Sequence, residues 1–513
     1  KGIIKMNRKQ SNIKFVGLHA HSVAGSIFDA LGYPQDHMDF AYENGCDALA
    51  LTDHGNMNGL AYQVLHAKKM HAEGKAFKPI FGCEAYFTPS IADWHDAYNQ
   101  AMEDKKRARS IKKDEQSGAT VEDEGDSKRI QGILKRRRHL VLLAQNQTGL
   151  SNLFKLISES YQPENFYRYP RIDYSLLKKY NEGIIASSAC LGGVYAGNYW
   201  EHREEGEEAV LEAMRESTRQ MVDIFGDRWY AEIQWNNIKE QHELNQYVIQ
   251  VAEEFGVELV TTADSHYPTP DAWKDRELYK RLGWLGKGRP SWAEDESQLP
   301  EGVEEIGYEL YPKNGDQMWE SYKQYSKEQG FEYNDSLVMR SIEETHRIAH
   351  ERIEAFLPDN TVRLPNFVVP AGFTDTQALV NYALEGLKDR GLHTNKEYTD
   401  RLRHELHVID ERGFSKYFLT MRSVADLATG MMLAGPGRGS AAGSLVAYTL
   451  NITQVDPIKH GLLFSRFLRS DATDYPDIDY DVSDSMALKE KLVEMWGADC
   501  VAPISNWNTL QLR

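Results

Sequence analysis

The sequence predicts an α/β protein in which a barrel-like domain is followed by a second domain. With 513 residues the chain is long enough for more than one hydrophobic core. Its hydrophobic content of 41% and aromatic content of 11% are typical of globular domains. Short β-rich runs alternate with helical patterns over the first 270 residues. That alternation is typical of a mostly parallel sheet covered by helices.

Seven β-rich runs carry the prediction of a barrel. They span residues 13–21, 46–54, 78–87, 138–145, 183–190, 229–235 and 257–266. Helical periodicity fills several of the gaps, for example at 34–45 and 240–256. Seven such units in this length predict a barrel or barrel-like (β/α)7 sheet.

The segment 101–138 interrupts this pattern. It holds 12 Lys and Arg and 8 Asp and Glu, with few large apolar residues. Such a composition does not bury a core, so we expect an exposed insertion. Its basic end, "KRRR" at 135–138, could contact a phosphate backbone or be a solvated loop. Further helical patterns follow at 336–353 and 375–392.

Charge and cysteine usage narrow the function classes. The net charge of −18 counts against a uniformly basic nucleic-acid-binding surface but allows a locally basic channel. There is neither a long apolar run nor a secretory signal pattern, so no membrane partner is expected. The four cysteines form no C-x-x-C pair, so neither a zinc ribbon nor a disulfide framework is indicated. We expect a cytoplasmic protein.

Potential metal ligands lie at or near the ends of five runs. They are His19, His21, His54, Glu84, Cys190, Asp264 and His266. Because the carboxyl ends of parallel strands form one face, these side chains should converge. Two further candidates fit less simply, since His139 begins its run and Asp29 lies in the loop after the first.

Each of these residues alone has an ordinary interpretation. A single histidine is usually a surface or hydrogen-bonded residue, and a single cysteine is often a small buried apolar side chain. Five runs with suitable ligands together favour a metal centre. Imidazole with carboxylate suits Zn, Mn or Fe, and the thiolate favours zinc. Clustered metals promote phosphoester hydrolysis, which is the chemistry this set predicts.

A glycine-rich stretch and an acidic one stand close together near the end of the chain. "GPGRGSAAGS" (435–444) combines a flexible turn, a helix start and Arg438, which suits a phosphate, although it also fits a glycine turn before a packed helix. It is not a Walker A loop. "YPDIDYD" (475–481) puts Asp477, Asp479 and Asp481 on alternate positions. Those acids indicate either a divalent cation or a solvated edge.

Several motifs resemble the polymerase-and-histidinol-phosphatase (PHP) domain. "LHAHS", "ALTDHGNMNGL", "KPIFGCEAYF", "RHLVLLAQN", "SSACLGG" and "TADSHY" are similar to the version at the N-terminus of bacterial and phage replicative DNA polymerases of the C family, the DNA polymerase III alpha subunits. The resemblance implies a cluster of Zn²⁺ or Mn²⁺ ions. Its nine ligands would be His19, His21, Asp29, His54, Glu84, His139, Cys190, Asp264 and His266.

The later motifs resemble the palm of the same family, a nucleotidyltransferase of the polymerase-beta type. They are "YFLTMRSVADLA", "GPGRGSAAGSLVAYTLNITQVDPIKHGLLFSRFL" and "YPDIDYD". The resemblance implies that Asp477 and Asp479 are catalytic ligands of Mg²⁺. It also implies a triphosphate-binding loop made of Gly437, Arg438, Gly439 and Ser440.

The resemblance further implies three parts. Residues 1–270 would be the PHP domain, 271–482 the N-terminal part of the palm, and 483–513 the start of a thumb. A third catalytic carboxylate of the family would lie beyond residue 513, so we expect an N-terminal fragment.

The function implied is template-directed DNA synthesis, with the PHP site acting as a 3′–5′ proofreading exonuclease. Partners would be a DNA primer–template, deoxynucleoside triphosphates, a sliding clamp and other replisome proteins, in a bacterium or a phage-infected bacterium. Two alternatives remain: a free-standing PHP phosphoesterase and a non-catalytic replisome scaffold.

Overall fold

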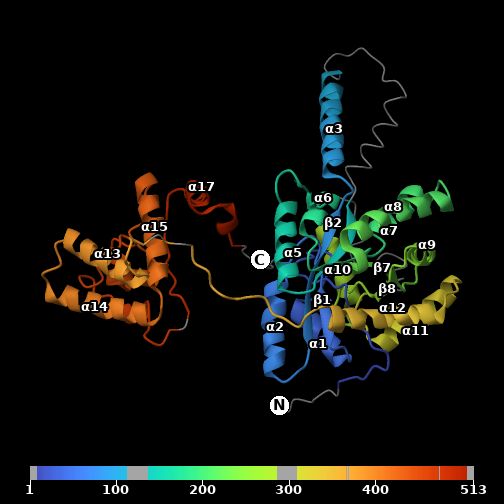
Figure 1. Ribbon diagram of the computed structural model, residues 1–513, viewed down its shortest axis with the longest axis horizontal. Coiled ribbons are helices and arrows are strands. Elements are labelled where there is room, and N and C mark those ends of the chain that lie inside the picture. Colours follow the sequence, from blue (N-terminus) through green and yellow to red (C-terminus); the bar gives the residue numbers. More distant parts are fainter. Residues whose placement is uncertain are drawn as a thin grey trace. The chain divides into compact units, whose positions relative to one another are not determined.

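The computed structural model describes residues 8–111, 137–285 and 309–504, apart from 366, 368 and 473. The chain divides into two compact units, residues 1–359 and 360–513 (Figure 1). The first unit thus extends past residue 270, the end of the predicted PHP domain. Among the described residues, no helix is long and apolar enough to cross a membrane.

The first unit is built on a six-stranded sheet with the order β1-β2-β3-β6-β7-β8. These strands are β1 (Ala48–Leu51), β2 (Lys78–Phe87), β3 (Arg138–Ala144), β6 (Ile184–Ser187), β7 (Trp229–Gln234) and β8 (Leu259–Thr262). A small separate sheet pairs β4 (Phe166–Tyr167) with β5 (Tyr169–Pro170). Each strand of the six-stranded sheet falls in one of the predicted runs.

The first predicted run joins the two edges of this sheet. Gly17 forms a parallel bridge with Leu49 at one edge, and Ala20 forms another with Ser265, just after β8. The Ala50 N–H donates to the Gly17 carbonyl at 2.8 Å, and the His21 N–H donates to the Ser265 carbonyl at 2.7 Å. The seven runs therefore form one curled sheet, and the predicted barrel-like α/β fold is confirmed.

Strand β3 runs against its neighbours. It pairs antiparallel with β2 and with β6, whereas β1–β2, β6–β7 and β7–β8 are parallel. The start of β3 therefore lies at the same end of the barrel as the carboxyl ends of the other strands. In the register of the ladder, His139 stands opposite Tyr86, two residues after Glu84.

Helices surround the sheet (Figure 1). They are α1 (Pro34–Glu43), α2 (Leu60–Ala72), α3 (Ile91–Ile111), α5 (Gln147–Ser160), α6 (Tyr174–Tyr180), α7 (Val194–His202), α8 (Glu207–Phe225), α9 (Lys239–Phe255), α10 (Trp273–Leu285), α11 (Gly315–Gln329) and α12 (Asp335–Arg347). The helices predicted at 34–45, 240–256 and 336–353 are confirmed as α1, α9 and α12.

Helix α12 shows why the first unit reaches residue 359. Its buried face includes Val338 and Ile342, spaced as one side of a helix. The hydroxyls of Ser341 and Thr261 lie 2.7 Å apart, and the Val16 N–H donates to the Thr345 hydroxyl at 3.1 Å. Helix α12 thus covers β8 and the first run, and belongs to the barrel's core.

The predicted insertion at 101–138 is only partly described. Its first residues continue α3, so they are helical. Arg138, the last residue of "KRRR", is buried, donates to Asn198 at 2.7 Å and pairs with Glu201 at 2.9 Å. This arginine therefore belongs to the core rather than to a solvated basic end, and residues 112–136 lie outside the described part.

The regular structure described in the second unit is mainly helical. Its helices are α13 (Asp375–Asp389), α14 (Lys396–Glu411), α15 (Ser415–Met431), α16 (Leu445–Thr449) and α17 (Ser485–Trp496). Helix α13 confirms the helix predicted at 375–392. Phe418, Leu419 and Leu445 lie in the unit's core. Among its described residues, the β-structure consists of one antiparallel bridge between Ala434 and Val482.

Candidate metal centre and triphosphate loop

The nine predicted ligands of the first unit lie together at the carboxyl ends of the barrel strands. Two buried carboxylates, Glu84 on β2 and Asp264 after β8, occupy the middle of the group. Imidazoles surround both. His21 shows how closely they are packed, because its ring centroid lies 4.1 Å from that of His54 and 4.4 Å from that of His266.

Glu84 contacts five predicted ligands from four other segments, among them His21 Nε2 at 3.8 Å. One oxygen lies 3.1 Å from His19 Nε2 and 2.9 Å from His139 Nδ1. The other lies 2.5 Å from His54 Nδ1. The Cys190 sulfur lies 3.9 Å from Glu84 Oε1 and 3.7 Å from His139 Nδ1. The antiparallel direction of β3 explains why His139 reaches the group although it begins its strand.

Asp264 is the second centre of the group. Its Oδ1 lies 3.2 Å from His19 Nε2, 3.1 Å from His21 Nε2 and 3.5 Å from His266 Nδ1. The backbone of Asp264 has a φ of 49°, in the left-handed region that non-glycine residues avoid. Such local strain is typical of functional sites.

Asp29, the loop candidate, lies at the more exposed side of the group. Its Oδ2 is 3.0 Å from His54 Nε2 and 3.7 Å from His266 Nε2. Arg276 on α10 fixes it, donating to the Asp29 carboxylate at 2.7 Å and to its backbone carbonyl at 2.6 Å. All nine candidates thus meet in one group.

Glu232 supports the group from behind and is absent from the sequence prediction. This buried carboxylate on β7 lies 2.8 Å from His19 Nδ1 and accepts from Ser187 at 2.6 Å and Thr262 at 2.5 Å. Such partners fix a ligand's ring and its tautomer. An acid inside the apolar run "WYAEIQW" was the signal available in the sequence.

Asp53, next to His54, is a second supporting acid that the prediction omits. It accepts from the Ser22 N–H at 2.6 Å and from the Ser26 hydroxyl at 2.8 Å. Ser26 Oγ in turn lies 3.3 Å from His21 Nδ1 and accepts from the His54 N–H at 3.2 Å. The carboxylate therefore orients two predicted ligands through one serine.

The buried carboxylates and imidazoles of the group shift one another's pKa values. Burial opposes ionisation of Glu84, but His139, His54 and His19 outweigh it and hold the pKa of Glu84 well below its usual range. Burial likewise opposes charge on His54, but Glu84 and Asp29 outweigh it and raise the pKa of His54 to about 10. Burial, His54 and His266 hold the pKa of His21 well below its usual range. A neutral imidazole is the metal-binding form.

Two buried atoms indicate that these residues suit a metal ion. His21 Nε2 and Asp264 Oδ1 lie 3.1 Å apart, yet neither has a hydrogen-bond partner of acceptable geometry. A buried polar atom without a partner is costly, and a shared metal ion removes that cost. Among the described residues, His21 and Asp264 form one candidate metal-binding triad with His19, and His54, Glu84 and His139 form another.

The predicted triphosphate loop lies in the second unit beside the acids. Arg438 lies 3.1 Å from Asp479 Oδ1 through Nη2 and 3.3 Å from Asp481 Oδ2 through Nε. Gly439 has a φ of 68°, and a Cβ there would come within 2.4 Å of Asp479. Two glycines, Gly437 and Gly439, thus bring the loop's backbone against the acidic segment, with Ser440 exposed after them.

The acidic segment is extended, and the chain after the loop differs from the expected helix start. Pro476 and Ile478 are buried while Asp477 and Asp481 are exposed, so the acids point away from the core as their spacing predicts. The loop leads into a 3₁₀ turn, Gly439–Gly443, and then into the short helix α16.

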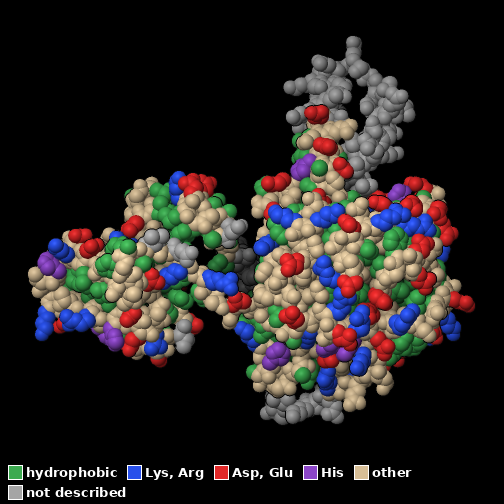
Figure 2. Space-filling model, viewed as in Figure 1, with side chains coloured by type: hydrophobic (Ala, Val, Ile, Leu, Met, Phe, Trp, Pro, Cys, Tyr) green, Lys and Arg blue, Asp and Glu red, His purple; other side chains and the backbone are tan. Residues whose placement is uncertain are grey.

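An ion pair between buried Glu405 and half-buried Arg401 supports this loop. Glu405 on α14 accepts from the Ser444 hydroxyl and the Val446 N–H, each at 3.0 Å, and lies 2.6 Å from Arg401. Arg401 also donates to the Gly443 carbonyl at 2.9 Å. Helix α14 therefore fixes the end of the glycine-rich segment. Figure 2 shows acidic and basic side chains intermingled over the visible face rather than a continuous basic surface.

Comparisons with known proteins match both parts of the chain. The PHP domain family matches residues 17–236, and the family described as the bacterial DNA polymerase III alpha NTPase domain matches residues 377–513. These matches contain the nine-residue group, except for Asp264 and His266, and the loop with its acids. The PHP match agrees with a metal-binding site in the first unit.

Relatives named DNA polymerase III subunit alpha match nearly the whole chain. The protein from Aquifex aeolicus is 35% identical over 97% of this chain and 39% of its own length. Those from Borreliella burgdorferi and Thermus aquaticus are 32% and 31% identical over 97% and 98% of this chain. The chain spans about two fifths of the length of these relatives. Over nearly its whole length the chain is therefore similar to the N-terminal region of DNA polymerase III alpha subunits, with a PHP domain followed by a match to the NTPase domain.

Proposed function

We propose that the chain is the N-terminal part of a replicative DNA polymerase that adds deoxynucleotides to a primer, and that its PHP site removes nucleotides from the primer's 3′ end. The observation that supports removal of nucleotides at the PHP site is the convergence of nine potential ligand side chains, with Glu84 and Asp264 at their centre. A set of imidazoles, carboxylates and one thiol suits a cluster of Zn²⁺ or Mn²⁺. Bound there, such ions would lower the pKa of water and stabilise the oxygens of a phosphodiester.

The chain's own residues would hold this cluster in two layers. His19, Glu84 and Asp264 are fully or almost fully buried and would form its inner side. His54 and Asp29 are more exposed and would face the substrate. Glu232 and Asp53 would keep the imidazoles oriented, because their hydrogen bonds already fix the rings.

Aromatic and basic side chains beside the group suit a nucleic-acid end. The ring of Tyr86 stacks against His54, with 6.1 Å between centroids. Arg137, which is exposed, lies over the ring of Tyr169 at 4.2 Å. Bases stack on aromatic rings and phosphates pair with arginine, so Tyr86 and Arg137 would hold the last nucleotides of a primer.

In the second unit, Arg438 would exchange its partners when a nucleotide binds. It now neutralises Asp479 and Asp481. A triphosphate would draw its guanidinium onto phosphate oxygens, which frees Asp477 and Asp479 to hold Mg²⁺. Gly437, Gly439 and Ser440 would offer backbone and hydroxyl donors to the same phosphates.

The exonuclease proposal is tested with a 5′-labelled primer whose 3′ end is mispaired. We expect shortening of the primer with Mn²⁺ or Zn²⁺, loss of activity with a chelator, and recovery when metal is restored. His54→Ala and Asp264→Ala should each lower the rate at least about a hundredfold, because ligand loss weakens the cluster. His202→Ala, which changes a partly exposed histidine on α7 outside the nine-residue group, is the matched control. Equal rates in all four proteins would refute the proposal.

The triphosphate proposal is tested by equilibrium binding of dATP with and without Mg²⁺. Arg438→Ala should weaken dATP binding by about tenfold or more, because a charge-assisted hydrogen bond is lost. The same variant should bind Mg²⁺ at least as well without nucleotide, since the acids are freed. Arg403→Ala, an exposed arginine paired with Asp400, is the control. Unchanged dATP affinity in Arg438→Ala would exclude this role.

A further inference from the structure

A second group of metal-ligand side chains lies at the opposite end of the barrel from the nine-residue group. Asp47 directly precedes β1, whereas His54 of the nine-residue group follows that strand. Beside Asp47 stand His346, in the last turn of α12, and His350, four residues later. The two groups therefore belong to different ends of the same strand and share no side chain.

The three side chains have the spacing of a small metal site. Asp47 Oδ1 lies 3.1 Å from His350 Nε2, and Oδ2 lies 3.5 Å from His346 Nε2. The ring centroids of His346 and His350 are 4.3 Å apart. With metal–ligand distances of about 2.0–2.2 Å, ligands of a tetrahedral ion stand about 3.3–3.6 Å from one another. One ligand atom from each residue lies within 4.8 Å of the other two, so small rotations of the side chains would complete the site.

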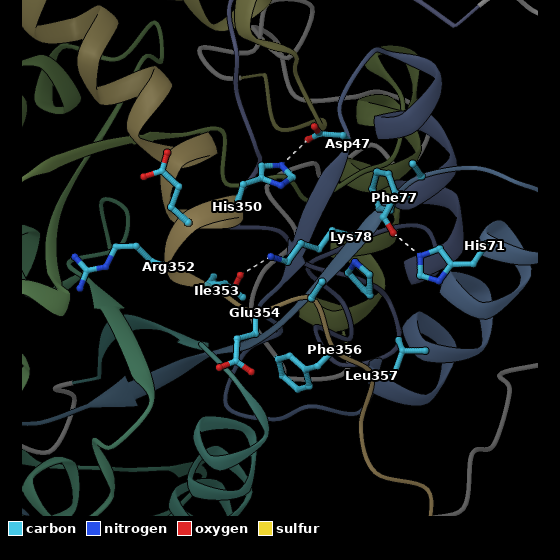
Figure 3. Close-up of a pocket in the computed structure, with 14 residues that line it drawn as sticks. Asp47, His71, Phe77, Lys78, His350, Arg352, Ile353, Glu354, Phe356 and Leu357 are labelled. Atoms are coloured by element: carbon cyan, nitrogen blue, oxygen red, sulfur yellow. Dashed lines mark hydrogen bonds and ion pairs between the residues drawn. The ribbon is translucent and has the colours of Figure 1, made fainter.

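The backbone holds these residues in place before any ion binds. The Lys78 N–H donates to the Asp47 carbonyl at 2.8 Å, which fixes Asp47 at the start of the sheet. The Lys78 ammonium donates to the carbonyls of Ala349 and Ile353, which flank His350. Figure 3 shows Lys78 beside Ile353. The chain from Ile348 to Arg352 forms one wide π turn. Both histidines are thus anchored through residues beside them, and their rings remain partly exposed.

The remaining side of the group opens into a cavity. Its volume is about 820 Å³, and its lining includes Asp47, His350 and Arg352. Figure 3 shows Asp47 and His350 facing each other at the edge of this cavity. An ion held by three protein ligands would keep a fourth position open to water or to a small molecule, as catalytic and exchangeable zinc sites do.

From this geometry we propose that Asp47, His346 and His350 form a second, independent site for a divalent transition metal, with Zn²⁺ the best match. Two histidines four residues apart with one carboxylate are a zinc-binding set. A bound ion would join the end of α12 to the start of β1. It would thereby fasten the helix that covers β8 and the first run to the strand that lies on the other side of that run.

The test is the number of Zn²⁺ ions bound per chain, measured by equilibrium dialysis of the full chain followed by elemental analysis. The double variant His346→Gln/His350→Gln should bind one ion fewer than wild type. His66→Gln is the matched control, because His66 also pairs with an aspartate, Asp39, at 2.9 Å but belongs to no candidate metal-binding triad among the described residues. Its zinc count should stay unchanged. An equal count in the double variant would overturn the proposal.

A second measurement separates this site from the nine-residue group. In a chain carrying His54→Ala and Asp264→Ala, one ion should remain, and adding His350→Gln should remove it. Zn²⁺ should also raise the melting temperature of that chain only while His346 and His350 are present, because binding to the folded state alone stabilises it. Melting that responds to Zn²⁺ equally with and without the two histidines would count against the site, whatever the outcome for exonuclease activity.

Discussion

His37 is a buried histidine whose surroundings favour its neutral form. Its Nε2 donates to the Leu31 carbonyl at 2.9 Å, and its Nδ1 has no hydrogen-bond partner among the described residues. Burial lowers the pKa of His37 to about 4, compared with about 6.5 for an exposed histidine. The folded state therefore resists protonation of this ring in acid.

This residue gives the first prediction, an effect on acid stability. Because the folded pKa is depressed, His37 contributes stability that is present above pH 6.5 and lost as the pH falls to about 4. The loss amounts to up to about 3 kcal/mol. His37→Gln keeps a donor for Leu31 but removes the titration, so its urea midpoint should fall less than that of wild type between pH 7 and pH 4.5. His407→Gln, an exposed change, should behave as wild type.

Among single residues, the candidate metal ligands were easier to predict from the sequence than the residues that hold them in place. Histidines after β-rich runs stand out, because few core positions require them. Glu232 and Arg276 act through the ligands they orient, and their partners come from distant segments. No local pattern connects such residues to a site, so only the folded chain reveals them.

The helices of the second unit carry two glycines in contrasting surroundings. Gly386 on α13 lies against α16, and a Cβ there would come within 1.9 Å of the Thr449 carbonyl. Gly430 on α15 has no atom within 4 Å of the same position. The first glycine allows two helices to touch, whereas the second has no packing role among its described neighbours.

The second prediction compares alanine at these two glycines. Gly386→Ala should destabilise the second unit by about 1–3 kcal/mol, because backbone atoms must move apart. Gly430→Ala should stabilise it by up to about 1 kcal/mol through helix propensity. Thermal melting followed by circular dichroism measures both. Equal melting of the two variants would contradict the close packing of α13 and α16.

The third prediction concerns the segment between β2 and β3. Replacing residues 101–136 by eight Gly and Ser residues should leave the melting temperature within a few degrees of the parent, because loop length changes closure entropy only slowly. The deletion must spare Arg138, whose buried guanidinium donates to Asn198 and pairs with Glu201 at the surface. Arg138→Ala in the full chain should lower the melting temperature more than the deletion does.

For the elements, the seven strands could be predicted because each run is short, apolar and followed by polar residues. The direction of β3 could not be predicted. Its run "RHLVLLAQ" is as rich in apolar residues as the runs that form the parallel strands. Strand direction depends on where the chain re-enters the sheet. His139 at the start of that run was the one indication, since it fits the ligand set only if the strand is reversed.

For the whole molecule, the fourth prediction compares two truncated chains. A chain of residues 1–359 should fold cooperatively, because it contains one compact unit. A chain of residues 1–270 lacks α11 and α12 and would expose the apolar side of β8, so it should aggregate or lose its cooperative transition. Melting curves and gel filtration measure both. A stable, monomeric 1–270 chain would show that α12 is dispensable for the barrel.

The sequence indicated that the chain has two domains, but it did not indicate the residue at which the first domain ends. The charged and mixed composition after residue 270 resembles a change of domain. The structure shows that the next helices still belong to the barrel, since Val338 and Ile342 are buried in the first unit. The composition of a segment indicates how much of it is exposed to solvent. Which core the segment packs into depends on contacts between residues far apart in sequence.

The reversed strand has a consequence for how this protein could change over time. Phe87, at the end of β2, and Arg138, at the start of β3, are partners in the ladder. The chain therefore leaves and re-enters the barrel at neighbouring positions, at the end of the barrel that carries the nine-residue group. A parallel connection must cross the whole barrel and has a minimum length, but this connection does not. New sequence inserted between these two residues would disturb no strand register, and it would start beside the site. That makes this junction the place where lineages could gain or lose segments beside the nine-residue group without rebuilding the fold.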